Sequence, residues 1–237
     1  MPKSAIIWAG VSSRDLGLVV DQIPNLNRPA RKATVYNVPG RNGDIVVMQD
    51  AWENVDQAYT IWGHASARNS ATAVGYSISE WLFAPTGYQV LSDTFDPGHF
   101  RRAYFAGPFD VENTLTRYGR ATITFHCDPR RFVAGVTPIT LSATGNVTNP
   151  TPFTAKPSIT VHGSGNGTVS CGGKTITITG IYDGMVLDCD AQDAYYPGVN
   201  LNSLISGDFP VIPSGEQEIT LTGGITSVEV APNWWTL

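Results

Sequence analysis

Histidines, cysteines and clustered aspartates are the residues of this chain whose types could support catalysis or metal binding. The four histidines lie in separate segments, without the spacing of an HExxH motif or of another metal site: His64, His99, His126 and His162. A hydrogen-bonded or exposed structural role is therefore favoured for each. His126 precedes Cys127, and neighbours on a strand point to opposite faces, so the two side chains are not expected to pair.

The cysteines are an odd set of three without a CxxC pair: Cys127, Cys171 and Cys189. Buried free thiols are favoured over disulfides or metal ligands. A group of aspartates could bind calcium in principle, but its spacing does not fit an EF-hand loop, and solvated loop carboxylates are favoured. That group is Asp183, Asp188, Asp190 and Asp193.

Other patterns that could indicate an active site are incomplete. Gly172-Gly173-Lys174-Thr175 lacks the upstream half of a phosphate-binding loop, and it predicts a hairpin turn instead. The chain contains no GxSxG motif. For the pairs Arg101-Arg102 and Arg130-Arg131, salt bridges within or between subunits are favoured over phosphate contacts. We therefore predict no catalytic residue, no metal and no cofactor, and we expect that the protein is not an enzyme.

Composition points to a globular, β-rich protein. Of the 237 residues, 42% are hydrophobic and 15% charged, and the chain holds 24 glycines and 16 prolines. These values are typical of β-structure with many turns. No apolar run reaches the length of a membrane span, and the apolar stretch near the N-terminus is too short for a secretion signal. Neither membrane insertion nor secretion is expected, and synthesis in a cytoplasm is the default.

The charge distribution predicts two domains. Residues 1–135 carry 13 basic and 12 acidic residues, whereas residues 136–237 carry 2 and 8. Residues 135–138 are the best linker, because the basic residues cease there and a Thr-, Gly- and Pro-rich half begins. The net charge of −5 argues against a general nucleic-acid binder. The predicted domains are 1–135 and 136–237.

The first domain should contain short strands, one helix and a sharp reversal. Strands are expected at residues 6–8, 16–20, 33–36, 45–48, 55–62, 87–91, 100–105 and 119–127, with Asp128-Pro129 ending the last one. A helix is predicted over 70–83, because apolar residues recur at steps of three and four, with Asn69 or Ser70 as cap and Pro85 as stop. The stripe comprises Ala71, Val74, Ile78, Trp81 and Leu82.

The reversal lies at Val38–Asp44, where Pro39, two glycines and Asn42 separate two β-prone runs. Asn42-Gly43 is the signal of a two-residue hairpin turn. The polar stretch 49–54 that follows carries Trp52 and is expected to form an irregular arm.

The second domain reads as a β-sandwich of about 100 residues, because short strands alternate with turn signals. Strands are expected at 139–143, 158–162, 168–171, 175–179, 185–188, 218–221 and 227–230. Turns are expected at 163–167, 172–173, 183–184, 213–215 and 223–224. The predicted fold class is mainly β, with two β-sandwich domains, the first bearing one helix and a projecting hairpin or arm.

A series of motifs, in order along the chain, resembles the distal tail protein family of long-tailed bacteriophages (siphoviruses). In the first half they are Ser12–Leu18, Val38–Asp44, Trp81-Leu82, Gly87–Asp93, Arg102–Tyr104 and Tyr118–Pro129. In the second half they are Asn149-Pro150, Pro157–Val161, Gly163–Gly165, Leu187-Asp188, Gly207–Pro210, Pro213–Glu216 and Pro232–Trp235. Each motif is weak alone, and it is their order over nearly the whole chain that carries the resemblance.

The resemblance implies a ring-forming N-terminal domain and a galectin-like C-terminal domain in a virion protein of the phage tail tip. It also implies a homo-hexameric ring with a central channel for DNA, and whether one ring or two back to back would form stays open. Its implied partners are the major tail tube protein, the tail-tip protein and a receptor-binding or baseplate protein. No sequence-specific contact with nucleic acid is implied.

Two residues are candidates for the subunit interface. As a hypothesis, Arg41 at the hairpin tip and Trp52 in the following arm reach a neighbouring subunit. The alternative for both, packing within their own chain, remains open.

Two other classes of function are alternatives: a carbohydrate-binding module and a β-sandwich hydrolase. A carbohydrate-binding module that recognises host cell-wall polysaccharide would use aromatic side chains: Tyr195, Tyr196, Trp234 and Trp235. It would require an exposed platform from the terminal Trp pair, although terminal aromatics next to Pro232 more often close a core. A β-sandwich hydrolase is least favoured, because no paired carboxylates or triad occur at an interpretable spacing.

Overall fold

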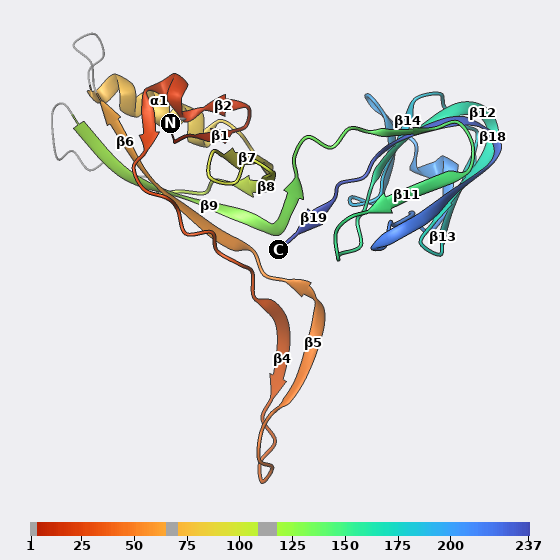
Figure 1. The fold of residues 1–237 in the computed structure, drawn as a ribbon, viewed down its shortest axis with the longest axis horizontal. Coiled ribbons are helices and arrows are strands. Elements are labelled where there is room, and N and C mark those ends of the chain that lie inside the picture. The colour runs from red at the N-terminus through yellow and green to blue at the C-terminus, as the bar shows by residue number, and fades with distance from the viewer. Residues whose placement is uncertain (1–3, 65–70, 109–117) are drawn as a thin grey trace. The chain divides into compact units, whose positions relative to one another are not determined.

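A computed structural model describes residues 4–64, 71–108 and 118–237, in which the chain forms two compact units (Figure 1). Unit 1 comprises Met1–Arg131 with Leu237, and unit 2 comprises Phe132–Thr236. The described residues are mainly β-strand with a single α-helix, which confirms the predicted fold class. No helix among them is long and apolar enough to cross a membrane.

Unit 1 is built on an antiparallel sheet with the strand order β2-β1-β7-β8-β9-β6-β3. Its strands are β1 (Ile6–Trp8), β2 (Val11–Ser12), β3 (Leu18–Val20), β6 (Val55–His64), β7 (Gln89–Asp93), β8 (His99–Tyr104) and β9 (Tyr118–Val133). A 3-10 helix, η1 (Ser13–Leu16), joins β2 to β3. Strands β6 and β9 pair over ten residues, from Val55↔Cys127 to His64↔Tyr118.

The helix α1 (Ala71–Phe83) confirms the helix predicted over 70–83. Its residues Ile78, Trp81 and Leu82 are buried in the same core as Trp8 and Phe125, whose rings lie 4.8 Å apart. The helix ends two residues before Pro85, since a proline disfavours helical geometry in the residue that precedes it. The predicted caps Asn69 and Ser70 lie outside the described residues.

Strand β9 does not end at Asp128-Pro129 as predicted but continues to Val133. The last pair of the β6–β9 ladder is Val55↔Cys127, so Pro129 lies beyond that ladder. Its missing N–H therefore removes no hydrogen bond from the ladder. The Asp128 carboxylate also accepts hydrogen bonds from the backbone and side chain of Arg130, which supports the chain at this point.

Strands β4 (Arg31–Tyr36) and β5 (Ile45–Trp52) pair only with each other, and we call this hairpin the arm (Figure 1). The predicted two-residue turn at Asn42-Gly43 is wrong, because the pair Tyr36↔Ile45 leaves residues 37–44 as the connection. Within it, Asn37 Nδ2 donates to Asp44 Oδ1 at 3.1 Å, and Gly40 and Gly43 have φ of 82° and 80°. The expectation of irregular structure from residue 49 onward is also wrong, since β5 continues to Trp52.

Unit 2 is a nine-stranded antiparallel assembly with the path β10-β18-β12-β14-β15-β16; β11 pairs with β18, β13 with β12, and β17 with β13. The strands are β10 (Ile139–Leu141), β11 (Gly145–Asn149), β12 (Ser158–Cys171), β13 (Lys174–Thr179), β14 (Met185–Asp188), β15 (Asp193–Tyr196), β16 (Val199–Asn200), β17 (Ile205–Gly207) and β18 (Gly215–Ala231). The unit also contains η2 (Asn202–Leu204) and β19 (Trp235–Thr236). Its core is mainly aliphatic, with Ile159, Val161, Leu187 and Val230 fully buried.

Two pairs of strands predicted in unit 2 are in fact two long strands. The predicted strands 158–162 and 168–171 are both parts of β12, and 218–221 and 227–230 are both parts of β18. The glycines at 163–167 and 223–224 mark register shifts inside the β12–β18 ladder rather than chain reversals. Gly172-Gly173, in contrast, forms the predicted turn between β12 and β13.

The glycines of this ladder allow two backbones to approach closely. A Cβ on Gly224 would lie 1.7 Å from Ser164 O, and a Cβ on Gly163 would lie 2.2 Å from Gly224 O. No L side chain fits at either distance, so these positions require glycine for space.

Gly224→Ala should therefore destabilise unit 2 by more than about 2 kcal/mol, because two packed strands would have to separate. Calorimetric unfolding of the variant measures this loss. The control is Gly75→Ala in α1, where a Cβ meets nothing within 4 Å. That substitution should be neutral or stabilising by about 0.5–1 kcal/mol. Equal losses in the two variants would contradict the close-approach explanation.

Candidate functional site

The described histidine side chains pair with aspartates rather than with one another. The Nδ1–Oδ1 distances are 2.8 Å for His99–Asp96, 2.5 Å for His126–Asp56 and 3.1 Å for His162–Asp183. The predicted structural role is confirmed for these three, whereas the side chain of His64 lies outside the description. His126 is half-buried on the face of β9 opposite the fully buried Cys127, as expected.

The four aspartates of the possible calcium group do not converge on one point. Asp183 pairs with His162, and Asp190 lies 3.5 Å from Lys156 Nζ. Asp188 accepts from the backbone of the loop that follows it, and Asp193 accepts from Asn202 Nδ2 at 2.7 Å. In the described ranges, no three His, Cys, Asp or Glu side chains are placed to hold one metal ion.

The three cysteines are free and buried, as predicted. Burial raises the pKa of Cys127 and of Cys189 to about 12, and it raises that of Cys171 as well. Thiolates are scarce at such values, so the three residues are poor nucleophiles at neutral pH.

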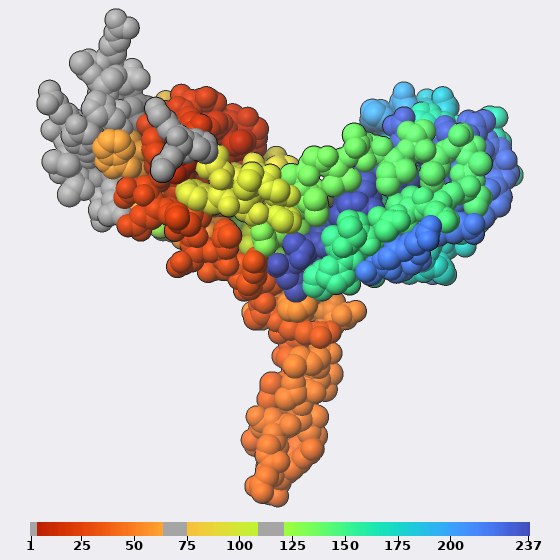
Figure 2. All heavy atoms as spheres, viewed as in Figure 1, coloured from red at the N-terminus to blue at the C-terminus, as the bar shows by residue number. Residues whose placement is uncertain are grey.

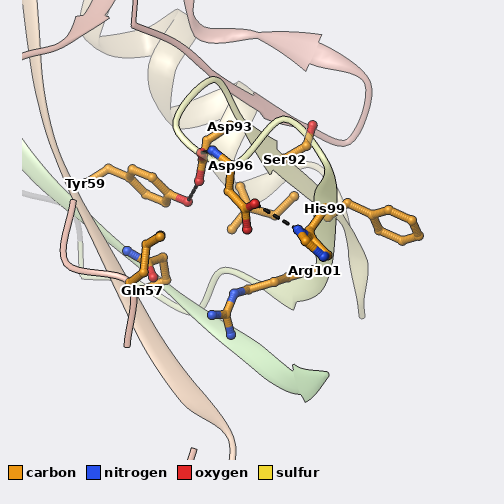
Figure 3. Close-up of a pocket in the computed structure, with 10 residues that line it drawn as sticks. Gln57, Tyr59, Ser92, Asp93, Asp96, His99 and Arg101 are labelled. Atoms are coloured by element: carbon orange, nitrogen blue, oxygen red, sulfur yellow. Dashed lines mark hydrogen bonds and ion pairs between the residues drawn. The ribbon is translucent and has the colours of Figure 1, made fainter. Parts of the chain in front are cut away.

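A buried polar cluster in unit 1 collects titratable residues from β6, β7, β8 and the loop between β7 and β8 (Figure 3). Tyr59 Oη donates to Asp93 Oδ2 at 2.7 Å, and Asp93 Oδ1 accepts the backbone N–H groups of Phe95 and Asp96. Burial, and then the charge of Asp93, raise the pKa of Tyr59. Tyr59 therefore stays protonated and acts as a hydrogen-bond donor to the carboxylate.

In the same cluster, Asp96 binds both His99 and Arg131. Burial alone would raise the pKa of Asp96, but hydrogen bonds and charges from His99 and Arg131 lower it overall. Arg131 is itself almost fully buried, which makes this an internal salt bridge of the kind expected for the arginine pairs. Each of these side chains has a structural partner, and the cluster contains no activated nucleophile.

No motif or spacing in the sequence marks Gln57 and Tyr59 as members of this cluster. Their partners lie far away along the chain, as with Asp93, which is 34 residues from Tyr59. The alternation of β6 would have shown only that residues 57, 59 and 61 share its inward face.

The arm, which Figure 2 draws in orange, carries a series of exposed apolar side chains. One of its faces carries the pairs Ala33↔Met48 and Val35↔Val46, and the other carries Thr34↔Val47 and Tyr36↔Ile45. Val46, Val47 and Met48 are exposed by 49%, 50% and 61%. Neither face is covered by the rest of the described chain, although isolated two-stranded hairpins are only marginally stable in water.

The two candidate interface residues lie at opposite ends of the arm. Arg41 is exposed in the connection 37–44 at the tip. Trp52 is half-buried at the root, where the Arg31 guanidinium lies 5.8 Å from the centre of its ring. Packing within the chain thus accounts for part of the burial of Trp52, and only Arg41 is fully available to a partner.

The terminal Trp pair considered for carbohydrate binding does not form the exposed platform that such a module would require, although Tyr195 is 37% exposed and Tyr196 packs on Tyr182. Trp234 is only 5% exposed and belongs to the core of unit 2. The ring of Trp235 stacks on Phe153 at 4.3 Å, and its Nε1 donates to Thr154 O. Trp234 therefore closes a core, and the exposed Trp pair needed for sugar binding is absent from this described terminus.

Solved structures of phage proteins match this fold over almost the entire chain. The Dit protein of phage SPP1 superimposes with a TM-score of 0.69 and 13% sequence identity, covering 96% of this chain and 98% of that one. The chain has the Dit fold. SPP1 Dit is a paradigm of the hub adsorption apparatus in phages that infect Gram-positive bacteria. The fold expected from the resemblance is therefore confirmed.

Chains of the phage P2 baseplate in its activated conformation match as well. With calcium the TM-score is 0.56 at 9% identity, covering 97% of this chain and 98% of that one. With strontium it is 0.55 at 8% identity, covering 96% and 97%. No protein-family model and no curated protein matches the sequence. At these identities the Dit likeness establishes fold alone.

Asp96→Asn should destabilise unit 1 by about 1–3 kcal/mol at pH 7, because Arg131 loses its buried anionic partner. The folded-state pKa of Asp96 lies below the ordinary value of 3.8. The stabilisation is therefore complete above that value and is lost as pH falls through the folded-state pKa. Calorimetry should show the difference from wild type shrinking as pH falls through and below 3.8.

The matched control is Asp50→Asn, which breaks a solvent-exposed pair with Arg31 in the same unit. That variant should unfold like wild type across the pH range, because exposed ion pairs contribute little. A pH-independent loss in Asp96→Asn would contradict the assigned role of the carboxylate.

Proposed function

We propose that this protein is a structural component of a bacteriophage tail tip, and that six copies form a hub ring. The ring joins the tail tube to the tail-tip protein, carries receptor-binding or baseplate proteins, and encloses a channel through which DNA passes. The near-full-length Dit fold supports this role, since the similar chains are a hub protein and baseplate components. The protein acts in the virion, and its role there is assembly rather than catalysis.

The arm is the observation that carries the proposal. In a closed ring of six subunits, each subunit uses two different surfaces, and each of these binds the complementary surface of a neighbour. An exposed hairpin with apolar side chains on both faces suits one of these two surfaces, because a neighbouring subunit would bury those side chains. Each exposed valine that becomes fully buried contributes about 1 kcal/mol or more to association.

The decisive experiment measures mass and shape in solution. Six copies of the 25.5 kDa chain give 153 kDa, and negative-stain images should show a six-fold ring with a central channel. Val46→Asp and Val47→Asp place a charge on opposite faces of the arm, and each should shift the protein toward monomer. The control Val199→Asp changes a valine of unit 2 with similar exposure, 46%, and should leave the ring intact. A wild-type protein that remains monomeric, alone and with tail partners, would refute the ring.

Arg41 and Trp52 are proposed to contact the neighbouring subunit from the tip and the root of the arm. Arg41→Ala should weaken the ring without changing the melting temperature of the monomer, because Arg41 is exposed in its own chain. Trp52→Ala should weaken the ring and also the arm, since it removes the ring over which Arg31 lies. Mass photometry over a dilution series measures both effects. If a folded variant dissociates at the same protein concentration as wild type, the substituted residue does not contribute to the interface.

A further inference from the structure

The segment that leads into the arm lacks the ladder support of a strand. Residues 21–30 connect β3 to β4 and contain no helix or strand; we call them the lead-in segment. Backbone hydrogen bonds to the rest of the chain hold its ends, from Asp21 N to Thr60 O and from Glu53 N to Ala30 O. Between these ends, side chains must hold the segment on unit 1.

Two buried side chains of the polar cluster bind the carbonyl groups of the lead-in segment. Gln57 Nε2 donates to Asn25 O at 2.9 Å, and Arg101 Nη2 donates to Asn27 O at 3.1 Å. In return, Asn27 Nδ2 donates to Asp56 O at 2.8 Å, beside Gln57 on β6. The segment is thus fastened to the strand that begins directly after the arm.

The burial of these two donors is costly to the fold. Gln57 is fully buried and Arg101 is 7% exposed. Burial lowers the pKa of Arg101, and the nearby positive charges of Arg131 and Arg28 act in the same direction. A buried cation without a bonded carboxylate is generally less favourable than an apolar side chain of similar volume. These polar residues donate hydrogen bonds to carbonyl groups of the lead-in segment, which apolar side chains in their place could not do.

Each of the two donor side chains also has a second, buried polar atom that lacks a hydrogen-bond partner in the described part of the chain. Gln57 Oε1 and Arg101 Nη1 are buried and have no hydrogen-bond partner among the described residues. Both residues line a cavity of about 10 Å³ between β6 and β8, which Figure 3 shows. That space fits one water molecule, which can donate to the amide oxygen and accept from the guanidinium.

We propose that Gln57 and Arg101, bridged by one buried water molecule, form a clamp that holds the lead-in segment and thereby anchors the arm on unit 1. The clamp is a positioning device: its two residues are buried, and they donate to the lead-in segment rather than to the arm. Its importance for ring assembly rests on the function proposed above, whereas the anchoring itself does not.

Gln57→Glu separates anchoring from stability. The new carboxylate can pair with Arg101, but it has no donor for Asn25 O, so two oxygen acceptors would face each other. Global stability should remain close to wild type, because the buried arginine gains a counter-ion. Amide hydrogen exchange over residues 21–30 should nevertheless accelerate by at least about tenfold, as local opening becomes easier.

Gln57→Met is the second variant, which keeps volume without the polar group, and it should release the same segment. Tyr59→Phe is the matched control: it lines the same cavity but binds Asp93 rather than the lead-in segment. It should leave exchange over residues 21–30 unchanged. The clamp would be overturned if both Gln57 variants exchanged over residues 21–30 at the wild-type rate. It would also be overturned if exchange became faster throughout unit 1 instead of in this segment.

The water and the assembly role have separate readouts. A high-resolution crystal structure should show one water within hydrogen-bond distance of Gln57 Oε1 and Arg101 Nη1, and a dry cavity would overturn the bridged form. Native mass then tests the link to the ring. If the segment is released while wild-type protein is monomeric, the clamp stands and the hub function fails. If wild-type rings form but exchange in the variants is unchanged, the clamp fails and the hub stands.

Discussion

The ten-residue ladder between β6 and β9 is the constraint on which unit 1 depends. Its alternation directs Tyr59 and Ile61 into the core with Phe125 and Ile123, while Asp56 and Ala58 face outward. A one-residue slip would exchange these two sets, so the buried face specifies the register strongly. Because β6 begins three residues after the arm ends, the same register also fixes where the arm leaves the sheet.

The polar cluster is compatible with this core because both of its carboxylates are hydrogen-bonded within it. Tyr59 neutralises no charge but donates to Asp93, and Arg131 and His99 both bind Asp96. Such a network resembles an active site in composition, yet its pairings hold a loop and a sheet together. A nucleophile or a base would need a free, activated group, and the titratable groups seen here are committed to structural bonds.

The sequence predicted the elements whose signals are local. The helix at Ala71–Phe83 follows from its apolar period and Pro85, and the turn at Gly172-Gly173 from its two glycines. Errors arose where one local signal has two meanings: Gly223-Gly224 permits close packing of two strands instead of a reversal. The pairing of Gln57 with Asn25 and of Tyr59 with Asp93 depends on the register of distant strands, which no local pattern contains.

The two apolar faces of the arm also explain why its root must be well held. A strand pair with one buried face has its register set by burial, but the arm has no such face within its own chain. Its register must therefore come from its ends. At the tip, Asn37 binds Asp44, and at the root Arg31 binds Gln49 O and lies over Trp52, next to a register shift between Arg31 and Ala33. In the ring proposed above, a neighbouring subunit would meet an arm whose side chains are already placed, so less conformational entropy would be lost on assembly.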